Sequence, residues 1–95
     1  MASLTYRIIK QEGFNEDFRE AVPEQEVSED ILNGLFFALH HFPEQGIPTG
    51  RASPSPVYAW RIQGTERNPP LIVYYCFQHP IVLLLSAHVT EQEET

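Results

Sequence analysis

Three apolar runs in the second half of the chain constrain its fold more than any other feature. Residues 57–63, 71–77 and 81–88 are each of strand length and are rich in Val, Ile and aromatic side chains. Gly and Pro mark the connections between them, at residues 64–70 and 78–80. Because strands joined by short turns pair in antiparallel fashion, the sequence predicts a three-stranded meander.

The first half of the chain predicts one strand and one short helix. Apolar and polar side chains alternate over residues 4–8, so a strand is expected to end near Lys10. Asn15 is a good N-cap for a helix that ends before Pro23. The apolar face of this helix comprises Phe14, Phe18 and Val22.

A second, longer helix is predicted to begin after Ser28 and to end before Pro43. Ser28 is the expected N-cap, and the acidic residues that follow it suit the positive end of the helix dipole. The predicted core-facing stripe is Ile31, Leu35, Leu39 and Phe42, widened by Leu32 and Phe36. Residues 43–56 hold four prolines and two glycines, and we expect them to form a linker or flap.

These elements predict an α+β fold in the order β-α-α-β-β-β. The expected architecture is a mainly antiparallel four-stranded sheet with two helices packed on one face. A chain of 95 residues fits a single domain, because a core of this size is not readily divided. The acidic residues 89–95 are expected to form a solvated tail.

Composition narrows the partners and the compartment. The formal net charge of −7 opposes a general attraction to nucleic acid or to anionic lipid. Residues 78–80 interrupt the most apolar stretch, so neither part is long enough to span a membrane. Arg7 breaks the apolar run that a secretory signal would need, and Cys76 is the only cysteine. A reducing, cytoplasmic location is therefore expected.

One face of the sheet is expected to stay open, because two helices cover only the other. If the strand registers agree, the bulkier set packs under the helices: Tyr58, Trp60, Ile62, Leu71, Val73, Tyr75, Phe77, Ile81, Leu83 and Leu85. Four apolar residues of the opposite set are the predicted partner-binding residues, namely Ile72, Tyr74, Val82 and Leu84.

Polar side chains fall on the same predicted open face. Arg61, Tyr74 and His88 are the candidate catalytic residues, and Ser86 lies beside them. Together they can hold a phosphate and move protons, as a ribonuclease without a metal requires. The same residue types are ordinary occupants of a solvent-facing sheet, so the sequence leaves open whether the chain is an enzyme.

No metal site and no cofactor are predicted. The four histidines, His40, His41, His79 and His88, include no pair at the spacing of helical metal ligands. The sequence also lacks a phosphate-binding Gly-rich loop, a nucleophile elbow and a Cys-x-x-Cys motif. Cys76 lies in apolar surroundings and is expected to be a packed, unreactive thiol.

The element order and the strand sequences resemble the RelE/ParE toxin family of toxin-antitoxin systems. The matching runs are Val-Tyr-Ala-Trp-Arg-Ile, Leu-Ile-Val-Tyr-Tyr and Ile-Val-Leu-Leu-Leu-Ser-Ala-His. In that family a Tyr-x-x-basic strand precedes a strand with aromatic residues and an apolar strand that closes near a His. Tyr58, Arg61, Tyr74 and His88 stand at those positions.

The resemblance implies a toxin-type domain that binds an antitoxin, with Arg61 as phosphate clamp and His88 as acid or base. Leu71, Val89 and Thr90 stand where the family carries basic residues, so degenerate or absent ribonuclease activity is also compatible with it. The alternative is a non-catalytic interaction or regulatory module that dimerises or binds another protein through its open sheet face.

Overall fold

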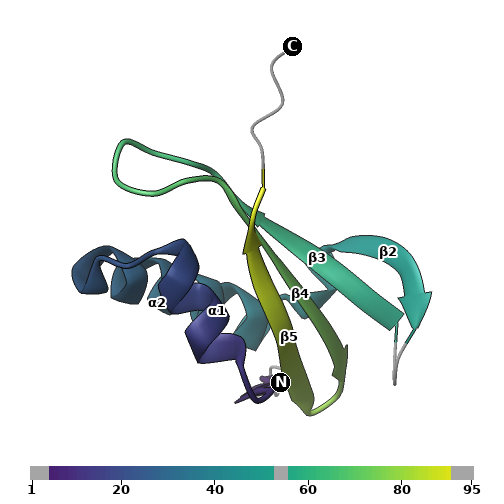
Figure 1. The fold of residues 1–95 in the computed structure, drawn as a ribbon. Helices are drawn as coiled ribbons and strands as arrows, with labels where there is room; N and C mark the ends of the chain where they lie inside the picture. The colour runs from purple at the N-terminus through teal and green to yellow at the C-terminus, as the bar shows by residue number, and fades with distance from the viewer. Residues whose placement is uncertain (1–4, 53–55, 91–95) are drawn as a thin grey trace.

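The computed structural model describes residues 5–52 and 56–90, and shows two helices on one side of a five-stranded sheet (Figure 1). Its elements are β1 (Arg7–Lys10), α1 (Phe14–Ala21), α2 (Gln25–His41), the 3-10 turn η1 (Pro43–Gln45), β2 (Ile47–Ala52), β3 (Pro56–Ile62), β4 (Leu71–Gln78) and β5 (Ile81–Val89). The strand order across the sheet is β1-β5-β4-β3-β2. The predicted α+β class and the β3-β4-β5 meander are confirmed.

The prediction of four strands is wrong, whereas the sheet is mainly antiparallel as predicted, with three of the four described strand pairs antiparallel. A fifth strand, β2, forms within the Pro-rich residues 43–56 and pairs antiparallel with β3. The first strand, β1, pairs parallel with β5, so the sheet is mixed. Leu4, residues 53–55 and residues 91–95 of the predicted acidic tail lie outside the described residues, whereas Val89 ends β5.

Strand β2 accommodates Pro48 and Gly50 because it lies at the edge of the sheet. Pro48 has no N–H to donate, but an edge strand pairs on one side only, so the hydrogen bonds between the central strands are unaffected. Gly50 has a φ of 86°, a left-handed conformation, and the register with β3 shifts between Pro48 and Ala52. The hydroxyl of Thr49 donates to the Val57 carbonyl at 2.8 Å, which adds a side-chain link across the irregular pairing.

Both helices begin earlier than their predicted caps. Gly13, with a φ of 92°, precedes α1, so Asn15 lies inside the helix. Helix α2 begins at Gln25, and the Ser28 amide donates to the Glu24 carbonyl at 2.9 Å, which closes a turn before the expected cap. Val27 is buried in the core, and this burial favours the extra turn.

The core lies between the helices and one face of the sheet. The helices contribute Phe14, Phe18, Val27, Leu35 and Leu39, and the sheet contributes Leu71, Val73, Tyr75, Val82, Leu84 and Ala87. Tyr58, Trp60, Ile62 and Phe77 pack against this cluster as predicted. Phe42, expected at the end of the α2 stripe, is instead exposed because the helix ends before it.

A β-bulge in β5 reverses the predicted faces of its first half. Tyr74 pairs with Ser86 but Tyr75 pairs with Leu84, so Leu85 has no partner in the register. Because one extra residue inverts the alternation, Val82 and Leu84 lie in the core with no exposed area, and the expectation that they lie on the open face is wrong.

A hydrogen bond from Tyr75 links the turn after α2 to the core. The Tyr75 side chain is fully buried, and its hydroxyl donates to the Pro43 carbonyl at 2.5 Å. Burial raises the pKa of the Tyr75 phenol above its ordinary value. Gly46 lies directly over this hydroxyl, so a β-carbon at that position would collide with it.

Candidate functional site

The open face of the sheet gathers the candidate catalytic residues in two adjacent rows. We use "open face" for the sheet surface opposite the helices. Arg61 on β3 pairs with Ile72 on β4, which pairs with His88 on β5. Tyr74 pairs with Ser86 in the next row. Three strands therefore place Arg61, Tyr74 and His88 on one surface, as predicted, and the bulge at Leu85 is what keeps Ser86 and His88 there.

His88 is the centre of the polar contacts in these rows. Its Nε2 atom lies 3.0 Å from the Ser86 hydroxyl, and its ring centroid lies 5.9 Å from that of Tyr74. Arg61 stands two strands away across Ile72, which corresponds to about 10 Å between backbones. An anionic group above Ile72 can therefore be approached by the guanidinium from one side and by the imidazole from the other.

The candidate catalytic residues lie on an exposed surface of the sheet. Arg61 and His88 are exposed, and Tyr74 and Ser86 are half-buried, so these rows do not form an enclosed cleft. The Ser86–His88 contact resembles a nucleophile and its base, but a catalytic pair also needs a group that orients the base. The described strands carry no Asp or Glu, but Asp17 and Glu20 of α1 line a pocket with His88.

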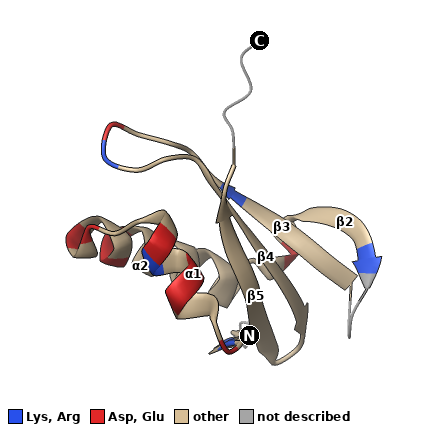
Figure 2. Ribbon diagram, viewed as in Figure 1, with Lys and Arg blue, Asp and Glu red and all other residues tan. Residues whose placement is uncertain are grey.

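Charge is distributed unevenly between the two layers of the fold. Figure 2 shows acidic residues gathered on the helices, whereas basic residues lie on the sheet and also on α1 and in the loop between β3 and β4. The strands hold Arg7, Lys10, Arg51 and Arg61, and Arg7 and Arg61 share the open face through their registers with Ile81 and Ile72. The open face is therefore locally basic on a protein whose net charge is −7.

The apolar residues of the open face differ in part from those predicted. Ile72 and Tyr74 lie there, half-buried, as expected. The places expected for Val82 and Leu84 are taken by Ile81 and Leu83, which pair with Gln78 and Cys76. The difference arises from the bulge within the Leu-Leu-Leu-Ser sequence, which residue alternation alone does not reveal.

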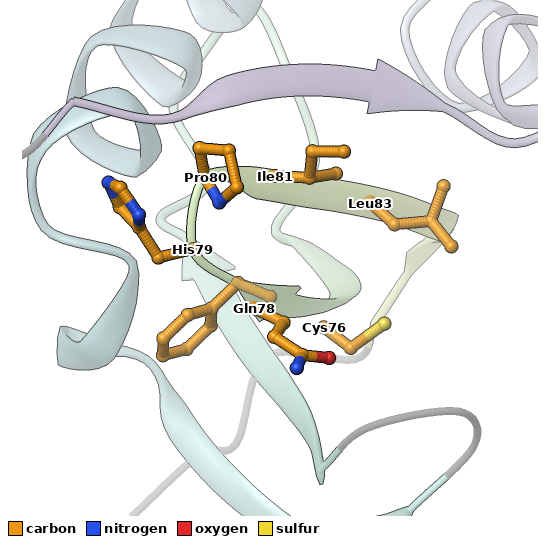
Figure 3. A pocket seen from close by; sticks show the side chains of 7 residues that line it. Cys76, Gln78, His79, Pro80, Ile81 and Leu83 are labelled. Atoms are coloured by element: carbon orange, nitrogen blue, oxygen red, sulfur yellow. The ribbon is translucent and has the colours of Figure 1, made fainter.

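A cavity lies at the end of the open face, where β4 turns into β5 (Figure 3). We call it the hairpin cavity; it has a volume of about 360 Å³ and is lined by Cys76, Phe77, Gln78, His79, Pro80, Ile81 and Leu83. Four of these, Cys76, Gln78, Ile81 and Leu83, belong to the open face by register. Cys76 is buried, in keeping with the prediction of a packed thiol.

The histidines are dispersed over the fold. His40 and His41 end α2. His79 lies in the β4–β5 turn, and its ring centroid is 5.0 Å from that of Tyr6 in a T-shaped arrangement. Within residues 5–52 and 56–90, no cluster of three or more His, Cys, Asp or Glu side chains is arranged to hold a metal ion. Over the same residues, neither helix combines the length and the apolar character that crossing a bilayer demands.

Comparison with protein-family models, with curated proteins and with solved structures found no match to this chain.

Proposed function

We propose that this domain binds an acidic, partly apolar protein segment across the open face of its sheet, as a RelE/ParE-like toxin-type domain binds its antitoxin. The observation that carries the proposal is the contrast between the two sheet faces. The helices α1 and α2 bury one face of β4 and β5, whereas the other face presents the half-buried Ile72, Tyr74 and Leu83 between Arg61 and Arg7.

The overall negative charge does not oppose this binding. A helix with its side chains is about 10 Å thick, so carboxylates on the outer side of α1 and α2 lie beyond a Debye length of about 8 Å from the open face. Asp17 and Glu20 of α1 are exceptions, because they line a pocket with His88. Away from His88, a partner that approaches the sheet meets mainly Arg61 and Arg7. Charge complementarity of this kind increases the association rate and selects acidic partners.

An acidic partner fits the open face better than a second copy of the chain. A symmetric dimer places the same patch of both copies together, so Arg61 and Arg7 of one copy would face the basic side chains of the other. Opposing like charges at an interface are destabilising. The homodimeric module remains the alternative that the experiment below distinguishes.

The proposal is tested by selecting a displayed library of random peptides against the folded domain. We expect the enriched peptides to be acidic and to carry large apolar residues, and Arg61→Glu to abolish their binding. Arg19→Glu makes the same charge change on the exposed side of α1 and should leave binding intact. Enrichment that Arg61→Glu does not reduce, or a concentration-dependent dimer without peptide binding, would overturn the proposal.

Ribonuclease activity is the second candidate, because Arg61 and His88 share a row and His88 contacts Ser86. Arg61 would clamp a phosphate while His88 transfers a proton. Induced expression in bacteria of the natural chain, Arg61→Ala and His88→Ala separates the two functions. Growth arrest with loss of messenger RNA that either substitution relieves supports cleavage, whereas normal growth and intact messenger RNA in all three cultures contradict it.

A further inference from the structure

Two features of the open face stand at opposite ends of the same strands, and they define the shape of the partner proposed above. Arg61 lies opposite Ile72 near the start of β4, and the hairpin cavity lies beside Cys76 and Gln78 near its end. Four to six residues of extended chain separate these positions, which corresponds to about 13–20 Å at about 3.3 Å per residue. The open face therefore presents a cationic side chain, Arg61, and the hairpin cavity at a fixed spacing.

The hairpin cavity suits a single large side chain. Its volume of about 360 Å³ is near the lower end of the range of about 300–1,000 Å³ found for small-molecule pockets. Leu83 and Ile81 supply apolar walls, and Gln78 supplies a polar one (Figure 3). An aromatic or long aliphatic anchor is the kind of residue that dominates binding energy when it fills such a hollow.

A helix meets the requirements of this face better than a single strand does. A lone strand laid across the face, rather than along an edge, leaves its own N–H and C=O groups without partners. An α-helix satisfies these groups internally, and a helix on this side adds a third layer to the two present. At about 1.5 Å per residue, eleven helical residues span about 16 Å, and residues i and i+11 lie within about 20° of each other around the axis.

We propose that the partner segment is an acidic amphipathic helix with a carboxylate and a large apolar side chain eleven residues apart on one face. The carboxylate pairs with Arg61, and the apolar side chain enters the hairpin cavity. Arg7 lies beside the cavity through its register with Ile81, so it favours a further acidic residue next to the apolar anchor. This inference rests on the proposed function and specifies its partner.

Two labelled synthetic helical peptides test the spacing. Both carry one Glu on an otherwise polar, helix-favouring background, with Phe eleven residues away in the first and nine residues away in the second. Nine residues rotate the Phe about 180° from the Glu, so the second peptide cannot use both points at once. We expect the first peptide to bind at least about tenfold more tightly in a fluorescence anisotropy titration, the effect of one good anchor.

Substitutions in the domain complete the test. Arg61→Glu should weaken the first peptide about tenfold, and Leu83→Asp should weaken it through the cavity, whereas Arg19→Glu should leave it unchanged. Circular dichroism of each variant confirms that it is folded. Equal binding of the two peptides, or no binding of either, overturns the helical spacing. The proposed function then still stands or falls on the displayed-library selection, which assumes no conformation.

Discussion

Leu83 and Leu84 are neighbours in the chain that the structure assigns to opposite faces of the sheet, and truncating each to Ala tests that assignment. Leu84 has no exposed area and pairs with Tyr75 inside the core. Leu83 is half-buried on the open face, opposite Cys76. Leu84→Ala leaves a cavity that the closed core cannot fill, at a cost of about 2–5 kcal/mol. Leu83→Ala removes side-chain atoms that are already partly in water, at a cost of about 1 kcal/mol.

The two variants should therefore differ by about 1–4 kcal/mol in the free energy of unfolding. At about 4–8 °C per kcal/mol for a domain of this size, Leu84→Ala should melt at least about 4 °C below Leu83→Ala. Urea and thermal unfolding can be followed by the fluorescence of Trp60, the only tryptophan, which packs against the core. If Leu83→Ala lost as much stability as Leu84→Ala, or more, the bulge and the assignment of faces in β5 would be wrong.

Three further outcomes follow from the turn around Tyr75. Tyr75→Phe leaves the Pro43 carbonyl without its donor and should lower the unfolding free energy by about 1–3 kcal/mol in urea titrations; an unchanged midpoint would contradict the hydrogen bond. Because the folded pKa of Tyr75 is raised above the unfolded value near 10, its contribution to stability is complete below pH 10 and is lost as the pH rises beyond it. The ordinary tyrosine pKa of about 10 sets the pH interval to examine. Between about pH 9 and pH 11 the natural chain should lose more unfolding free energy than Tyr75→Phe does. Equal losses in the two proteins would refute the raised pKa of Tyr75. Gly46→Ala should destabilise the natural chain but do so less in a Tyr75→Phe background, because the colliding hydroxyl is gone; additive effects in the double variant would argue against that contact.

Most of the fold follows from local pattern in the sequence. The alternation in β3 and β4 places Tyr58, Trp60, Val73 and Tyr75 in contact with the core, and the prolines and glycines mark both turns of the meander. These elements are predictable because their periodicity agrees with the burial that the fold imposes. The positions of Arg61, Tyr74 and His88 on one face follow from the same alternation.

The errors arise where tertiary contacts outweigh local signals. Pro48 and Gly50 indicate a loop, yet the free edge of β3 pairs with this segment. Ser28 is a good helix cap by residue type, but burial of Val27 extends the helix past it. Three successive leucines carry no alternation from which the bulge at Leu85 can be located, so alternation places the open-face residues of β5 one position away from where they lie.

The central claim is that a partner covers the open face of the sheet, and chemical-shift mapping tests it most directly. The isotope-labelled domain would be titrated with an acidic peptide taken from the displayed-library selection while amide signals are followed by nuclear magnetic resonance. We predict that the largest changes fall on Arg61, Ile72, Tyr74 and Leu83, with α1 and α2 little affected. Changes centred on the outer surfaces of the helices, with β3, β4 and β5 unaffected, would contradict the account.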